Sequence, residues 1–197
     1  VALAMGEGSH RPSHPNDVLL RRFGDCKDKS LLLVTILRSL GIQSWPALAS
    51  IDGGKNLSER LPSPTLFDHA IALVEVDGKR FWLDSTRNAQ AGSLETLGFH
   101  DFGKALVIGI NASGLTDVTP PEGYANNVLV TEVFDVNAYR EPVNLKVETV
   151  FRGERAEWIR RVLAARDIED IEKLFTSDLV RRYPSTISTS PPAISDN

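Results

Sequence analysis

Residues 67–86 read FDHAIALVEVDGKRFWLDST. Two runs rich in β-branched and aromatic residues flank Asp77-Gly78, a dipeptide that is typical of a two-residue type I′ hairpin turn. If these two residues form the loop, Val76 lies opposite Lys79 and the strands pair outward from there. The stretch therefore predicts an antiparallel hairpin that extends to Thr86.

The same register brings a histidine and an aspartate together. It places Asp84 opposite Ile71, and Thr86 opposite His69. Because side chains alternate along a strand, His69 and Asp84 share one face as diagonal neighbours, with Cα atoms roughly 7–8 Å apart. An imidazole and a carboxylate can meet across that distance. Trp82 lies on the same face, where it is either a wall of a substrate groove or a core aromatic residue.

The only cysteine of the chain lies upstream, at the start of an apolar segment. Residues 24–30 read GDCKDKS and are followed by LLLVTIL, which predicts a helix that runs from Cys26 to just before Gly41 and is buried on most sides. A thiol at a helix N-terminus meets the positive end of the helix dipole and unpaired N–H groups, and Lys27 and Lys29 add positive charge. This position favours a reactive thiolate, although a free cysteine is also a common core residue.

The three side chains together are suited to nucleophilic catalysis. A carboxylate bonded to one imidazole nitrogen orients the ring and stabilises its protonated form, which leaves the other nitrogen free to take a proton from a thiol. The sequence therefore predicts a catalytic triad of Cys26, His69 and Asp84.

Three motifs resemble those of the transglutaminase-like superfamily, in the same Cys…His…Asp order. They are RFGDCKDK at 22–29, FDHA at 67–70 and WLDST at 82–86. More narrowly, GDCKDK and the segment after it resemble large bacterial proteins in which a transglutaminase-like core lies between two β-rich domains. The resemblance covers residues 1–112, and the segment from about residue 120 is similar to the start of the C-terminal β-rich domain.

The resemblance implies an α+β fold related to papain-type cysteine proteases. A central helix bearing Cys26 would pack on an antiparallel sheet that carries His69 and Asp84. It also implies an N-terminally truncated catalytic core over 1–112, followed by an incomplete β-rich module with two helices over 113–197. The implied activity is acyl transfer or hydrolysis on peptide or protein amides, with the Cys26 N–H as one oxyanion donor, in an extracytoplasmic, periplasmic protein.

Patterning predicts further elements. Strands are expected at 44–51 and 105–110, and a mobile loop, which is either a lid or a surface insertion, at 52–66. Beyond them, the predicted elements are strands at 128–136 and 143–151 and helices at 154–165 and 168–183.

Composition narrows the classes of function. The formal net charge of −4 argues against a nucleic-acid partner, and no apolar run reaches the roughly 20 residues that span a bilayer. One cysteine excludes an internal disulfide framework and a multi-cysteine zinc site.

His10 and His14 are four residues apart but lack a nearby carboxylate cluster, so we expect no metal and no cofactor. The expected partners are a peptide or protein substrate and the flanking domains of a longer protein.

Two other interpretations remain open at this level. The chain can be a binding or scaffold module that keeps the fold without the activity, because fold alone does not imply function. It can also be an unrelated structural protein, which a His69–Asp84 separation too long for a hydrogen bond would favour.

Overall fold

Helices and strands alternate irregularly along the chain. The computed structural model describes residues 10–109 and 114–196, and its mixture of helices and antiparallel strands confirms the α+β class. The chain divides into two compact units, of which the first contains Val1–Asn88 and Phe99–Tyr124, and the second Ala89–Gly98 and Ala125–Asn197.

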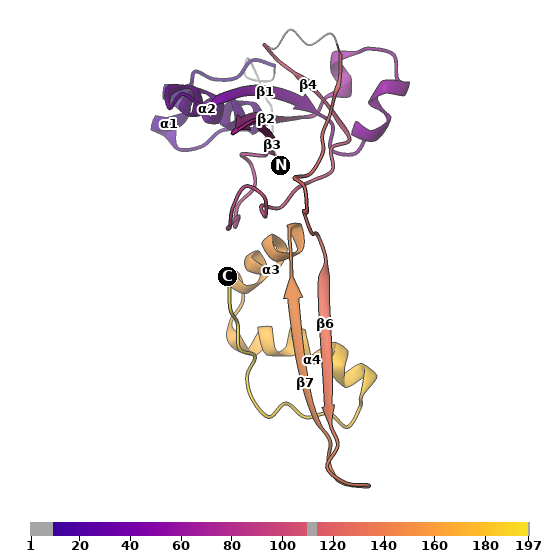
Figure 1. The fold of residues 1–197 in the computed structure, drawn as a ribbon. Coiled ribbons are helices and arrows are strands. Elements are labelled where there is room, and N and C mark those ends of the chain that lie inside the picture. The colour runs from indigo at the N-terminus through magenta and orange to yellow at the C-terminus, as the bar shows by residue number, and fades with distance from the viewer. Residues whose placement is uncertain (1–9, 110–113, 197) are drawn as a thin grey trace. The chain divides into compact units, whose positions relative to one another are not determined.

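The first unit consists of one five-stranded sheet and the helices that accompany it (Figure 1). Its elements are α1 (Pro15–Arg21), α2 (Cys26–Ser39), β1 (Gln43–Ala49), β2 (His69–Val76), β3 (Lys79–Leu83), β4 (Lys104–Val107) and β5 (Thr116–Asp117), with two 3-10 helices, η2 (Gly54–Glu59) and η3 (Pro64–Leu66). The strand order is β3-β2-β1-β4-β5, and every neighbouring pair is antiparallel.

The predicted hairpin is confirmed in its register. Val76 pairs with Lys79, and the ladder continues to the pair of Ala72 and Leu83. Asp77 and Gly78 have φ angles of 50° and 73°, as a type I′ turn requires at both central residues.

The second strand of the hairpin is shorter than the sequence predicts. β3 ends at Leu83, and the N–H of Arg87 bonds to the carbonyl of Asp84 to close a turn. At that level β2 pairs only with β1, where His69 lies opposite Ala49. Asp84 and Thr86 therefore lie in a turn just beyond the strand, although Asp84 keeps the face that the register predicts.

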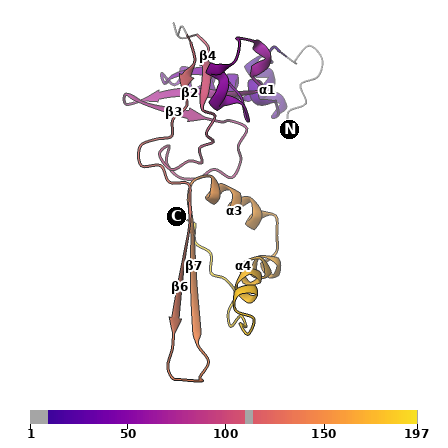
Figure 2. The same cartoon turned by 90° about the vertical axis from the view of Figure 1, so that its right-hand side faces the viewer.

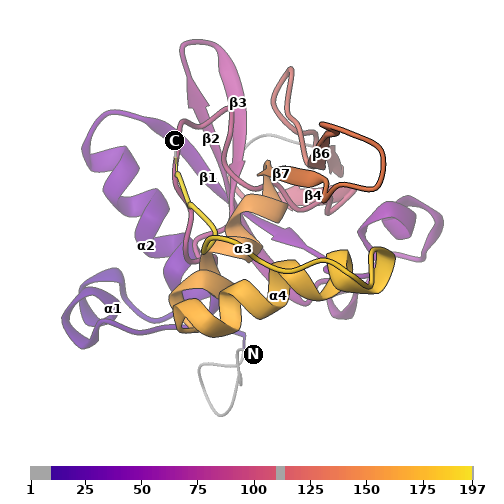
Figure 3. The ribbon, with the colours of Figure 1, turned by 90° about the horizontal axis from the view of Figure 1, so that it is seen from below.

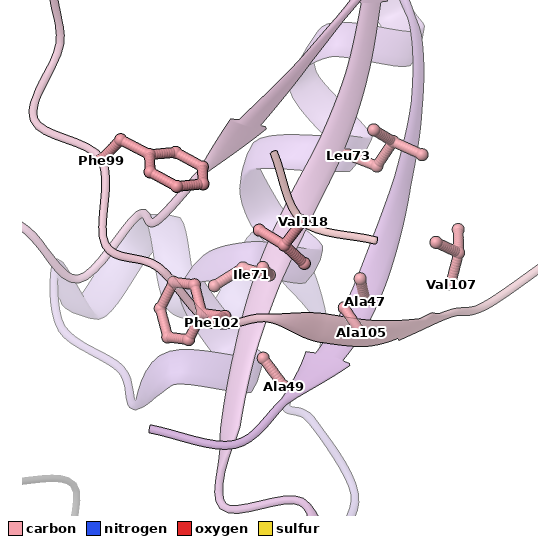
Figure 4. Close-up of a cluster of buried hydrophobic side chains, with 9 residues drawn as sticks. All are labelled: Ala47, Ala49, Ile71, Leu73, Phe99, Phe102, Ala105, Val107 and Val118. Carbon is pink, nitrogen blue, oxygen red and sulfur yellow. The ribbon is translucent and has the colours of Figure 1, made fainter. Parts of the chain in front are cut away.

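The two faces of the sheet bury different cores. On one face, Val34 of α2 packs against Ala72 and Val74 of β2, and Figure 3 shows α2 alongside β1–β3. The other face carries a larger cluster (Figure 4). Its members are Ala47, Ala49, Ile71, Leu73, Phe99, Phe102, Ala105, Val107 and Val118. The alternating residues of β2 thus enter both cores, which explains its nearly continuous apolar sequence.

Helix α2 ends where the sequence predicts but is less buried than expected. Its last residue is Ser39, and Gly41 follows in a left-handed conformation with φ 79°. Only the stripe that contains Val34 is buried, because the sheet covers one side, whereas Ile36 and Leu40 are exposed. The prediction that most of its surface is buried is wrong.

The segment between β1 and β2 packs against the residues that precede β4. Leu57 of η2 is buried, and the backbone of Gly54 lies so close to Phe102 that a Cβ atom at Gly54 would be 1.7 Å from the Phe102 carbonyl oxygen. Only glycine permits this approach.

The second unit consists of a hairpin and two helices (Figure 2). Its elements are β6 (Val128–Asp135), β7 (Asn144–Phe151), α3 (Glu154–Ala164) and α4 (Ile168–Arg182). All four correspond to predicted elements. One face of the hairpin meets α4 through the ring pair of Phe151 and Phe175.

The unit boundary differs from the one expected at 112/113. β5 pairs with β4, and Val118 is buried in the core of the first unit. Residues 89–98 belong to the second unit, where the buried Glu157 of α3 accepts hydrogen bonds from the Gly98 N–H at 2.6 Å and from Gln90 Nε2 at 2.8 Å.

The expected strand at 105–110 is β4, and Ile110 lies outside the described residues. None of the helices in the described ranges is long and apolar enough to cross a bilayer.

We predict that Gly54→Ala destabilises the first unit by about 1–3 kcal/mol, because the added methyl group must displace the backbone at Phe102. The measurement is urea unfolding followed by tryptophan fluorescence in a Trp158→Phe background, so that only Trp45 and Trp82 of the first unit report. Gly114→Ala is the control, since a Cβ there meets nothing within 4 Å. Equal midpoints for the two variants would contradict the prediction.

Candidate active site

The nucleophile candidate is the first residue of α2. Asp25 caps the helix, and its carboxylate accepts a hydrogen bond from the Asp28 N–H at 3.1 Å. This leaves Cys26 in the first helical turn with a half-buried thiol. Among the described residues, no hydrogen bond uses the Cys26 N–H.

The turn before Cys26 is held by the buried carboxylate of Asp28. Its two oxygens accept from the Ser13 N–H at 2.7 Å and from Arg21 Nη2 at 2.5 Å, which ties α1 to the start of α2. Gly24 makes room for this carboxylate, because a Cβ atom there would be 2.7 Å from the Asp28 Cβ. The GDCKDK motif is therefore a local scaffold that presents the cysteine.

His69 and Asp84 meet as the register predicts. His69 Nε2 lies 2.9 Å from Asp84 Oδ2, and both side chains are nearly buried, with exposed fractions of 11% and 12%. The long separation that would favour an unrelated structural protein is therefore absent. Because Nε2 bonds to Asp84, Nδ1 is the ring nitrogen that remains for the thiol.

The thiol of Cys26 completes the chain of three side chains. Its hydrogen bond with the His69 ring is the largest influence on the pKa of Cys26 and lowers it. The Ala70 N–H lowers this pKa further, whereas burial and the Asp25 carboxylate raise it. The net result is a Cys26 pKa below the ordinary thiol value.

The pKa values of the other two groups are displaced in opposite directions. Burial alone would lower the pKa of His69, but the hydrogen bonds with Asp84 and Cys26 outweigh it and raise that pKa to about 9. Burial would raise the pKa of Asp84, yet bonds from His69 and Thr86 hold it below its usual value. The arrangement thus favours a thiolate beside an imidazolium, with the carboxylate behind the ring.

Lys27, one of the two lysines near Cys26, is arranged differently from the expectation. The Lys27 ammonium pairs with the Asp25 carboxylate, and the imidazole of His69, 43 positions further along the chain, is the main group that lowers the Cys26 pKa. The helix terminus therefore places the thiol, and the sheet supplies the group that lowers its pKa.

One buried hydroxyl connects the three elements that carry these residues. Ser30, four residues after Cys26 on α2, is 1% exposed and donates to the Ala70 carbonyl at 2.9 Å. Its oxygen also lies 3.2 Å from the Ser85 hydroxyl, next to Asp84. Ser30 thereby links the helix to the strand of the histidine and to the turn of the aspartate.

Aromatic residues line the face of the sheet that carries His69. The buried Phe102 stacks on the imidazole, with ring centroids 5.5 Å apart and an interplanar angle of 22°. Trp82 lies opposite Leu73 and packs, partly buried, against the larger core cluster. Its role as a wall of a substrate groove stays a prediction.

Several of these contacts were not singled out from the sequence. The turn at Thr86 has a signal, since Asp-x-Thr at a strand end favours local side-chain bonds to the backbone. Ser30 has one as well, because positions i and i+4 share a helix face. Nothing in the sequence indicates that Phe102 stacks on His69.

Within the described residues, no group of three His, Cys, Asp or Glu side chains is placed to hold a metal ion. His14 instead caps α1, with its side chain accepting from the Asn16 N–H at 3.4 Å. In comparisons with known proteins, no family model, curated protein or solved structure matches the chain.

We predict that Cys26 ionises below the ordinary thiol pKa of 9.0, because the protonated His69 stabilises the thiolate. Since this is the only cysteine, the pH-dependent absorbance at 240 nm that is lost in Cys26→Ala reports on its thiolate, with the tyrosine contribution subtracted. The titration midpoint of the native protein should lie below that of the urea-unfolded chain. The His69→Gln variant should shift the midpoint upward, and a native midpoint equal to the unfolded one would refute the prediction.

We further predict that Ser30→Ala lowers the free energy of unfolding by about 1–3 kcal/mol, because it leaves the buried Ala70 carbonyl without its donor. The fluorescence assay described for Gly54 measures this loss. Ser39→Ala on the same helix is the matched control, because its hydroxyl is exposed, and a change under about 0.5 kcal/mol is expected there. A loss in Ser30→Ala no larger than in the control would show that the buried link is dispensable.

Proposed function

We propose that the first unit is a transglutaminase-like cysteine enzyme that performs acyl transfer or hydrolysis on peptide or protein amides. The single observation that carries the proposal is the 2.9 Å contact between His69 and Asp84 beside the Cys26 thiol, whose pKa the His69 ring lowers. A thiolate, a protonated imidazole and an orienting carboxylate are the groups that this chemistry needs.

The location of the groups also supports the proposal. The nucleophile begins a helix that packs on an antiparallel sheet. His69 begins β2, and Asp84 lies in the turn that follows the edge strand β3. This is the arrangement that the motif resemblance implies for a transglutaminase-like core. The order along the chain, Cys26 then His69 then Asp84, is the same as in that superfamily.

The proposed reaction proceeds in two steps. The Cys26 thiolate attacks the carbonyl carbon of an amide, and the tetrahedral intermediate expels an amine that takes its proton from His69 Nδ1. A thioester to Cys26 remains. His69 then removes a proton from water or from an acceptor amine, which attacks the thioester and releases the thiol as product forms.

Two groups assist the charges that develop. The Cys26 N–H, in the first turn of α2, is the proposed donor to the oxyanion. Asp84 stays ionised throughout, because its pKa lies below the ordinary range, and it stabilises the imidazolium in each step.

The test is to trap the acyl-enzyme. The protein is incubated with a library of short peptides, quenched in acid, and searched by mass spectrometry for an acyl group on the peptide that contains Cys26. We expect an adduct in the unaltered protein and none in Cys26→Ala. We expect formation to be slower by about 10²- to 10⁴-fold in His69→Gln, which lacks the proton donor.

His10→Gln is the matched control, because His10 is exposed and outside the site. Adding a primary amine separates the two activities, since transfer gives an amide product and hydrolysis gives the free acid. Peptides that bind without forming an adduct, together with alkylation of Cys26 no faster than a model thiol, would instead favour the binding or scaffold module.

A further inference from the structure

The Asp84 carboxylate has a different partner on each oxygen. Oδ2 faces His69 Nε2 at 2.9 Å. Oδ1 accepts two hydrogen bonds from one residue, from the Thr86 N–H at 2.9 Å and from the Thr86 hydroxyl at 2.6 Å. Both oxygens of this nearly buried carboxylate are therefore engaged.

The turn after β3 makes this double contact possible. In a continued strand, Thr86 would point in the same direction as Asp84 about 7 Å further along and would not reach it. Because β3 ends at Leu83 and a turn closes between Asp84 and Arg87, residue 86 folds back over the carboxylate. The short strand thus has a consequence for the site.

We propose that Thr86 is a positioning residue of the acyl-transfer site, holding Oδ1 of Asp84 so that Oδ2 stays directed at His69. The inference rests on the proposed function, because it concerns the same three side chains. Thr86 acts through Asp84 and does not itself meet the reacting atoms.

The chemistry of the contact explains the effect. A carboxylate with one oxygen fixed cannot rotate about its Cβ–Cγ bond without breaking two hydrogen bonds, so the lone pair that meets Nε2 stays aligned. Without the hydroxyl, water competes for Oδ1 and the carboxylate gains freedom. His69 then binds its proton less tightly, and less of Cys26 is thiolate at neutral pH.

A simple alternative is that Thr86 only stabilises the turn. Its side chain is exposed and its bonds are local, as in many turns at strand ends. A turn stabiliser changes the free energy of unfolding but not the protonation of an imidazole bonded to the opposite carboxylate oxygen. The two roles therefore differ in the pKa of His69.

The experiment compares Thr86→Val, Thr86→Ser and the unaltered protein. Thr35→Val is the matched control, because the Thr35 hydroxyl is exposed and donates to the Leu31 carbonyl on α2. The pKa of His69 is followed by NMR of labelled imidazole rings, assigned by the loss of one of four signals in His69→Gln. The rate of Cys26 alkylation by iodoacetamide is measured against pH on the same samples.

We expect Thr86→Val to move the pKa of His69 down from about 9 towards 6.5 and to slow alkylation at pH 7 by about three- to tenfold. Thr86→Ser keeps the hydroxyl and should restore both values, and Thr35→Val should leave both unchanged. Urea unfolding of each variant confirms that it is folded, and Thr86→Ala serves as a second variant without the hydroxyl.

The negative results are distinguishable. If the pKa of His69 is raised in the unaltered protein and neither Thr86→Val nor Thr86→Ala lowers it, the positioning role is overturned while the proposed function stands. The positioning role is equally overturned if the variants change only the unfolding midpoint. If the pKa of His69 is near 6.5 in the unaltered protein and the thiol is not activated, the proposed function fails, and the role of Thr86 fails with it.

Discussion

The register of β2 against β3 is the constraint on which the site depends. Asp77 and Gly78 both adopt positive φ in the turn that joins the strands, and this closure determines which residues face each other. A slip of one residue would move Asp84 to the face covered by α2, away from His69. The 2.9 Å contact between the two side chains is thus a direct result of a two-residue loop several positions away.

The register alone does not bring the cysteine to the histidine. Cys26 reaches His69 only if α2 has a fixed position along the sheet. The buried Ser30 hydroxyl holds that position by binding the Ala70 carbonyl and the Ser85 hydroxyl. The cost of burying His69 is then offset by its hydrogen bonds to Asp84 and Cys26, which raise its pKa to about 9. Removing water destabilises the charged form of an isolated group, but it strengthens the attraction between opposite charges that are paired. The three groups therefore favour one another's ionised forms.

The sequence was sufficient for those parts of the fold that depend on neighbours. The hairpin, the helix that begins at Cys26 and the pairing of His69 with Asp84 follow from turn chemistry and alternation over about 20 residues. The sequence was not sufficient for contacts between segments that lie far apart along the chain. Phe102, in the segment before β4, stacks on the His69 ring and lies against Gly54 of the β1–β2 segment, and Val118 joins the first unit because its side chain fills that core.

By itself, then, the sequence determined which residues carry the candidate chemistry and on which strand face two of them lie, since both depend on local backbone geometry. Only the tertiary structure decided how strongly those residues interact. The end of β3 at Leu83 and the fold-back of Thr86 onto Asp84 replace the extended strand that alternation predicts for residues 84–86. The lowering of the Cys26 pKa by an imidazole 43 positions away depends on how a helix packs on a sheet. Electrostatic interactions depend on distance in space, and burial depends on packing. Residues far apart in the sequence come close together only when the chain has folded.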